Sequence, residues 1–298
     1  MTIDLKRAAS FMATHARTLD RRRFRLLVGD DARTVDAAGV RAALDSYRNP
    51  DGGYGWGLEP DLRGAESQPA AALHAFEAMA DAAPATTPGS AALCDWLHSV
   101  TLDDGGLPFA LPIGNPAGCA PFWVDADANA SSLQITAAVA TQAHRVARFD
   151  PAVASHPWLA SVTRYCLDAI RAVDAAPFAY VLSFALQFLD AAIDTVPEAR
   201  AVLAHLGQFV PADGAIPVVG GAAGESLRLL DFAPCPDRPV RALLTEEAVA
   251  ADLHRLASQQ QPDGGWTVDF QSYSPAAALE WRGYMTVRAV ATLQTNEH

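Results

Sequence analysis

Cysteine is scarce in this sequence, and long uninterrupted apolar runs are missing. The four cysteines, Cys94, Cys119, Cys166 and Cys235, lie far apart and form no Cys-x-x-Cys pair, which excludes a zinc-knuckle spacing and a disulfide scaffold. The N-terminal region lacks the apolar core of a signal peptide. The most apolar stretch, 177–189, is too short to span a bilayer. We therefore expect a cytoplasmic protein without a transmembrane segment.

Positive charge is also in short supply. The chain has 22 basic and 34 acidic residues and a formal net charge of −12, which disfavours binding to nucleic acid because that depends on Lys and Arg at the phosphates. The eight histidines are scattered without a ligand-like pair, and no phosphate-binding loop, dinucleotide fingerprint or nucleophile elbow occurs. We expect neither a metal nor a cofactor.

Signals for β-strands are nearly absent, whereas a glycine-containing turn recurs between Ala- and Leu-rich segments. Its first two copies lie 53 residues apart and its last two 50 apart, and the interval of 109 between them leaves room for one degenerate copy. This spacing predicts five to six repeated units. The four copies are Asp51-Gly52-Gly53, Asp104-Gly105-Gly106, Asp213-Gly214-Ala215 and Asp263-Gly264-Gly265.

Each repeat is predicted to be an outer helix, a glycine turn and an inner helix. Helix starts are marked by a capping residue followed by Pro, at Thr87-Pro88, Asp150-Pro151 and Ser274-Pro275. We expect Gly53 and Gly265 to take positive φ angles, which close the outer helix. The inner helices are predicted at 66–80, 129–146, 177–190, near 225–230, and at 275–293.

Five or six such hairpins would stack as an open solenoid or close into a ring. The predicted inner helices are apolar nearly all round, as expected for helices that pack on both sides. This pattern favours closure. The prediction is therefore an all-α fold, a single domain over residues 1–298 that forms a closed α/α toroid, or double ring of helices.

The turns Gln260-Gln261-Pro262-Asp263-Gly264-Gly265-Trp266 and Asn49-Pro50-Asp51-Gly52-Gly53-Tyr54-Gly55-Trp56 look like the Q–W-type repeat of squalene–hopene cyclases. The chain thus resembles the terpenoid cyclase/protein prenyltransferase α/α-toroid superfamily, and within it the small bacterial proteins that carry this repeat. The resemblance covers most of the chain. It implies the toroid and leaves the activity open, because one fold serves many functions. The Asp-x-Cys zinc pair of the prenyltransferases does not occur here, so that branch is rejected.

The resemblance also implies a candidate acid. Class II terpene cyclases protonate an alkene with the middle Asp of an Asp-x-Asp-Asp motif, and Asp125-Ala126-Asp127-Ala128 resembles it, with Ala128 in place of the last Asp. Asp127 would be the proton donor, and Asp125 would orient it or raise its pKa. Either residue is alternatively a helix cap. This is the isoprenoid cyclase-like interpretation, with a hydrophobic isoprenoid-like substrate.

Other polar and aromatic residues are predicted to line the same pocket, since only a closed ring brings their segments together. If residues 57–63 are extended, their side chains alternate between two sides, so that Glu59, Asp61 and Arg63 lie on the same side. The alternative is that Asp61 and Arg63 only stabilise the loop by contacting each other. Glu280 should face a cavity or pair with Arg282 or Arg288, because an unpaired buried charge is costly. The predicted substrate-binding residues are Glu59, Asp61, Trp56, Trp123, Glu280, Trp281 and Tyr284.

Two further interpretations remain open at this level. A carbohydrate-active toroid would use Glu59 or Asp61 with Glu280 as a carboxylate pair. A toroid that binds a lipid or a partner protein would need no chemistry, and its acidic residues would all be caps or ion pairs. An apolar cavity would favour the cyclase, and a polar groove the carbohydrate enzyme.

Overall fold

The computed structural model describes residues 3–29 and 33–297, and for residues 33–35 the backbone alone. This part of the chain is predominantly helical, as predicted, and its one sheet is a two-stranded antiparallel hairpin of β1 (Ile216–Pro217) and β2 (Ser226–Leu227). No helix within it is both long enough and apolar enough to cross a membrane.

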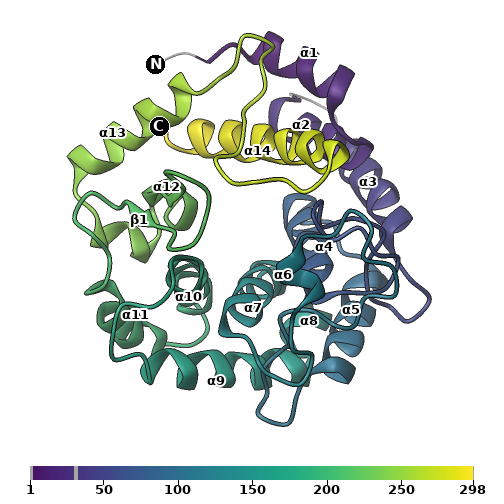
Figure 1. Ribbon diagram of the computed structural model, residues 1–298, viewed down its shortest axis with the longest axis vertical. Coiled ribbons are helices and arrows are strands. Elements are labelled where there is room, and N and C mark those ends of the chain that lie inside the picture. The colour runs from purple at the N-terminus through teal and green to yellow at the C-terminus, as the bar shows by residue number, and fades with distance from the viewer. Residues whose placement is uncertain (1–2, 30–32, 298) are drawn as a thin grey trace.

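The helices form an inner and an outer series around the short axis of the molecule (Figure 1). The inner series is α2 (Thr18–Val28), α4 (Pro69–Asp81), α7 (Leu133–Ala147), α10 (Ala179–Ala192), α12 (Leu229–Phe232) and α14 (Pro275–Thr295). The outer series is α1 (Leu5–His15), α3 (Arg33–Leu44), α5 (Pro88–Val100), α9 (Pro157–Arg171), α11 (Ala199–Gly207) and α13 (Glu246–Ser258). The connections contain α6 (Pro121–Val124), α8 (Pro151–Ala154), η1 (Asp45–Tyr47) and η2 (Pro239–Leu243).

Successive inner helices contact one another. α4 packs against α2 and α7, α10 against α7 and α12, and α14 against α2. Arg288 on α14 donates from Nη2 to the carbonyl oxygen of Asp231 on α12, at 3.3 Å. These helices are buried on most sides: nine of the thirteen residues of α4 are buried, so their apolar character follows from their central position.

The two ends of the described chain lie side by side. α1 packs against α14, and the side-chain amide of Gln260 forms hydrogen bonds in both directions with the backbone of Asp4. Asp4 N donates to Gln260 Oε1 at 2.8 Å, and Gln260 Nε2 donates to Asp4 O at 2.9 Å. An N-terminal helix is thus held against a turn that lies more than 250 residues later.

The predicted helix starts agree with the structure. Thr87, Asp150 and Ser274 each accept a hydrogen bond from a backbone N–H in the first turn, with Pro at the next position. Four of the five predicted inner helices are present within a few residues of their predicted bounds. The fifth, expected near 225–230, is the short α12, which begins only at Leu229 because Ser226 and Leu227 pair with β1.

The glycine turns share one set of hydrogen bonds, which explains the repeat. The Asp of each copy accepts from the backbone N–H two residues later: Asp51 from Gly53, Asp104 from Gly106, Asp213 from Ala215 and Asp263 from Gly265, at 2.9–3.1 Å. In every copy the residue directly after the Asp has positive φ, between +67° and +97°.

Our expectation for the second glycine of the pair is therefore wrong. Gly53 and Gly265 do not have positive φ. They are required for a different reason, since a Cβ on Gly265 would lie 2.8 Å from the Phe11 ring, and one on Gly53 would lie 2.6 Å from the Ser67 side chain. The first glycine supplies the backbone angle, and the second allows a close approach of neighbouring segments.

Candidate functional site

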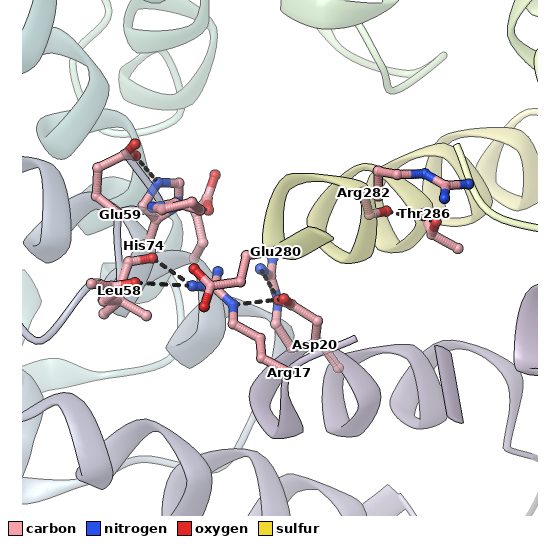
Figure 2. Close-up of polar contacts among 12 residues, drawn as sticks. Arg17, Asp20, Leu58, Glu59, His74, Glu280, Arg282 and Thr286 are labelled. Atoms are coloured by element: carbon pink, nitrogen blue, oxygen red, sulfur yellow. Dashed lines mark hydrogen bonds and ion pairs between the residues drawn. The ribbon is translucent and has the colours of Figure 1, made fainter. Parts of the chain in front are cut away.

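The loop 57–63 passes between α2, α4 and α14, and its carboxylates face inward. The turn before it is conformationally special: Trp56 has φ +57° and Gly57 has φ +71°, and a left-handed conformation is rare for a bulky residue. Arg17 donates from Nη1 to the carbonyl oxygen of Leu58 at 2.8 Å. Its Nε also donates to the buried carboxylate of Asp20 at 2.6 Å. Arg17 therefore joins this loop to α2 (Figure 2).

Glu59 binds a histidine that is itself held by a second carboxylate. Oε2 of Glu59 lies 2.7 Å from Nε2 of His74, and Nδ1 of His74 lies 2.8 Å from Oε2 of Glu77. Burial by itself would lower the pKa of His74, but Glu77 and Glu59 outweigh burial and raise it to about 9. Burial would raise the pKa of Glu77, but His74 and Arg23 lower it to about 2. The imidazole is thus a cation between two anions at neutral pH.

The chain of hydrogen bonds continues to α14. Tyr284 donates from its hydroxyl to Oε1 of Glu77 at 2.8 Å. The guanidinium carbons of Arg23 and Arg288 lie 5.6 and 5.8 Å from the Tyr284 ring centroid. Arg23 also donates to Asp81 at 2.7 Å. Among the described residues, α2, α4 and α14 therefore meet through a dense ionic network.

Asp61 connects the loop to the C-terminal segment. Its Oδ1 accepts from the backbone N–H of Tyr273 at 2.8 Å, and its Oδ2 accepts from Nε1 of Trp281 at 2.7 Å. The residue is 3% exposed. Burial raises its pKa above the ordinary value, although the N–H groups of Tyr273 and Trp281 act in the opposite direction. Asp61 is thus a buried carboxyl group whose pKa is raised by burial.

Arg63 and Glu280 form the most accessible part of this cluster. Nη1 of Arg63 lies 2.7 Å from Oε2 of Glu280, and the two side chains are 28% and 20% exposed. The Arg63 side chain is confined by Gly57 and Gly118, where an added Cβ would come within 3.3 Å of it. Its Nε and Nη2 donate to no described residue. A positioned guanidinium therefore retains hydrogen-bond donors for a ligand.

The structure brings most of the predicted residues together. Glu59, Asp61, Glu280, Trp281 and Tyr284 lie within one connected set of contacts, with the His74 ring 6.0 Å from that of Trp281 and 5.2 Å from that of Tyr284. Glu280 pairs with Arg63, and with neither Arg282 nor Arg288. In Figure 2, Arg282 lies further along α14, away from Glu59 and His74. The suggested Asp61–Arg63 contact is likewise replaced by longer-range partners.

Asp125 and Asp127 are not part of this set. Both are exposed, and Oδ1 of Asp127 accepts from the backbone N–H of Asn129 at 2.9 Å. Asp127 thus stabilises a local turn, and α7 begins only at Leu133. It lacks the apolar enclosure that an acid strong enough to protonate carbon requires.

Two of the predicted aromatic residues lie at the edge of the cluster. Trp56 is 57% exposed, and its Nε1 donates to Asn49 at 2.7 Å. Trp123 is 8% exposed and stacks on Phe109, with ring centroids 4.4 Å apart. The segment before Trp123 adjoins the loop, since Ala120 N donates to the carbonyl oxygen of Asp61 at 2.8 Å.

The sequence reasoning missed His74, Glu77, Arg17 and Arg23. A signal for two of them was present: His74 and Glu77 are three residues apart in a helix whose other residues, apart from Asp81 at its end, are apolar, and this spacing places them on one face of the helix. Arg17 and Arg23 gave no such signal, because Arg23 belongs to a basic run that resembles a solvated helix end.

A separate depression lies on the outside of the molecule. Its volume is about 520 Å³, and it lies between the turn 101–105 and α9, where Asp103, Arg164 and Tyr165 contribute to its lining. It contains none of the predicted site residues. Within the described residues, no group of three or more His, Cys, Asp or Glu side chains is arranged to hold a metal ion.

Comparison with known proteins identifies a structural relative. A solved structure of a protein from Actinoplanes is similar over 98% of this chain and 98% of its own chain, with a TM-score of 0.57 and 15% sequence identity. The sequence matches no family model and, at the level that indicates homology, no curated protein. At this identity the likeness concerns the fold alone.

Proposed function

We propose that the chain is a closed α/α toroid that binds and acts on a carbohydrate-like ligand at the Arg63–Glu280 ion pair. Closure is supported by the contacts of the inner helices, which run from α2 through to α14 and return to α2. The bonds between Gln260 and Asp4, at the two ends of the chain, support it as well. Residues 1–298 are then one domain.

The class of ligand is proposed from the Arg63–Glu280 ion pair, which is partly exposed and lies beside aromatic side chains. A sugar has hydroxyl groups that bond to guanidinium and carboxylate groups, and C–H faces that lie against aromatic rings. Trp281 adjoins Glu280 in the chain, and the Tyr273 backbone binds the carboxylate of Asp61. An isoprenoid chain bound against the ionic network behind this pair would displace water from the charged groups and offer them no hydrogen bonds in return, which is unfavourable.

The chemistry proposed for the site uses two carboxyl groups with different surroundings. Asp61 is the acid, because burial raises its pKa. Glu280 is the base, because it is ion-paired with Arg63 and partly open to solvent. Such a division between two carboxyl groups is the arrangement used in glycoside hydrolysis. Arg63 orients a ligand hydroxyl through its remaining N–H donors.

An isoprenoid cyclase remains a second candidate, with Asp61 in place of Asp127 as the acid. The observation that favours it is the aromatic surround of Asp61. Trp281 donates to its carboxylate, and the Phe270 ring lies 5.1 Å from the Trp281 ring. Aromatic faces stabilise a carbocation. Both candidates need a buried carboxyl group, and they differ in the ligand.

The test is direct binding and turnover with both ligand classes. We expect saturation-transfer NMR to detect binding of one or more methyl glycosides from a panel of glucose, galactose, mannose and xylose. Glu280→Gln should weaken that binding by about tenfold or more, and Asp61→Asn should abolish turnover. Asp127→Asn is the matched control and should change neither.

The outcomes separate the candidates. If no glycoside binds, the carbohydrate proposal is wrong. If squalene or a polyprenol is cyclised and Asp61→Asn stops the reaction, the cyclase is correct. If a ligand binds and no variant affects any turnover, the toroid is a binding protein.

A further inference from the structure

The indole N–H of Trp123 is a buried donor without a partner. Trp123 lies in α6 and is 8% exposed, and its Nε1 is inaccessible and donates to no described residue. In four other tryptophans, by contrast, Nε1 has an acceptor. Trp56 donates to Asn49, Trp158 to Thr101, Trp266 to the carbonyl oxygen of Leu256, and Trp281 to Asp61. A buried N–H group without an acceptor is costly, so this indole needs an explanation beyond packing.

The surroundings of Trp123 form an aromatic corner that is open on one side. The Trp123 ring stacks on Phe109 and lies 5.3 Å from Phe122. Phe122 is 47% exposed, and its ring meets the edge of Tyr273 at 5.7 Å. Its neighbour Val124 is 41% exposed. Exposed apolar surface of Phe122 and Val124 is therefore available to a ligand next to a buried donor that has no partner.

This corner adjoins the proposed site. Arg63 donates from its backbone N–H to Sγ of Cys119 at 3.2 Å, and Ala120 N donates to the carbonyl oxygen of Asp61. The chain thus passes from contacts with Asp61 and Arg63 directly into α6. Cys119 and Ala120 are therefore the residues that join the proposed site to this corner.

We propose that Phe122 and Trp123 form a subsite for a neutral aromatic ring that bears an oxygen, and that this oxygen accepts a hydrogen bond from Trp123 Nε1. The ring lies against the exposed Phe122 ring in the edge-to-face manner that aromatic groups prefer, as the Tyr273 ring already does at 5.7 Å. The group is not an anion, because Asp125 and Asp127, both exposed, follow Trp123 within four residues and would repel one, and an oxygen that accepts from the indole needs no charge. The inference rests on the proposed function in one respect: the ring is the aglycone of a ligand whose sugar binds Arg63.

The experiment observes the tryptophan indoles directly. The chain has six tryptophans, and labelling with 15N-tryptophan gives one Nε1–H signal for each; Trp123→Phe identifies the signal of Trp123. The probes are phenol, phenyl β-D-glucopyranoside and methyl β-D-glucopyranoside. Phenol and the phenyl glycoside should move the Trp123 signal downfield as its N–H becomes bonded, and the methyl glycoside should not.

Two variants make the test specific. Phe122→Ala, at an exposed position, should weaken binding of phenol by about tenfold while the protein remains folded. Trp123→Phe should abolish the preference for phenol over toluene, because toluene has no acceptor oxygen and the variant has no indole N–H. The signal of Trp56, whose N–H is already bonded, is the internal control.

The subsite is overturned if saturating phenol leaves the Trp123 signal in place, or if Phe122→Ala binds phenol as the parent does. Failure of the carbohydrate proposal gives a different result: phenol moves the Trp123 signal, the phenyl glycoside binds no more tightly than phenol, and the methyl glycoside does not bind.

Discussion

Nε2 of His74 lies 2.7 Å from Oε2 of Glu59, and this contact fixes the acidic loop to the inner helix α4. The other ring nitrogen binds Glu77, which in turn accepts from Tyr284. One imidazolium thereby links the loop, α4 and α14. These elements are therefore joined by an ionic contact that depends on a group that titrates.

The stability of the protein should fall as pH rises between about 6.5 and 9. In the folded state the pKa of His74 is raised from 6.5 to about 9, so in this window the folded chain holds a proton that the unfolded chain has released. The free energy of unfolding is then greatest below pH 6.5 and decreases by up to about 1.4 kcal/mol per pH unit. The loss amounts to about 3 kcal/mol at pH 9. Urea unfolding at several pH values measures it.

His74→Gln is the control for this pH dependence. The variant is less stable at pH 6.5, and its free energy of unfolding should be nearly constant up to pH 9. The low pKa of Glu77 reports the same interaction from the other side and is not added to it. Equal slopes in the parent and the variant would show that His74 is not the titrating group.

The last glycine turn, 263–265, packs against α1, and its first glycine should tolerate no side chain. Gly264 has φ +97°, and a Cβ there would lie 2.2 Å from the backbone of Arg7. Gly264→Ala is expected to lower the free energy of unfolding by about 3 kcal/mol or more. Gly220 is the matched control, because it has φ +81° and nothing within 4 Å of a Cβ, so Gly220→Ala should cost only about 1 kcal/mol. Similar losses in the two variants would contradict the role of close approach.

Asp61 and Asp127 should respond oppositely to replacement by Asn. Asp127→Asn keeps the oxygen that accepts from the N–H of residue 129, so the free energy of unfolding should change by less than about 0.5 kcal/mol. Asp61→Asn leaves one acceptor oxygen for two N–H donors, and the new amide would face the other donor. This variant should therefore cost about 1–3 kcal/mol and also abolish turnover. Loss of activity in Asp127→Asn with Asp61→Asn active would reverse the assignment.

The contact between the chain ends should depend on Gln260. Its amide makes two hydrogen bonds with Asp4, and Gln260→Ala removes both. We expect faster hydrogen exchange in α1 and a loss of about 1–2 kcal/mol. Gln261 is a matched control, since its side chain donates only to the nearby carbonyl oxygen of Gln259. Unchanged exchange in α1 on removal of Gln260 would show that packing alone holds the ends together.

Local chemistry is the part of this protein that its sequence predicts well. The Asp of each glycine turn binds an N–H group two residues away, and the Ser, Thr or Asp before a Pro binds one in the first helical turn. These interactions need no distant partner, so their spacing could be read directly. The same locality explains the error at Asp127, where a motif that resembles an acid site forms a turn instead.

The composition of the site was decided by tertiary structure. Trp281 donates to Asp61 across 220 residues, and Arg63 pairs with Glu280 across 217. From the sequence, these segments were expected to meet only because the helices were predicted to close into a ring. The predicted partners of Glu280, Arg282 and Arg288, were wrong because they were sought on the same helix. Which opposite charge a buried carboxylate meets depends on how helices are ordered around the centre (Figure 1). Burial then converts that contact into a shifted pKa, as at His74, because water no longer screens the charges.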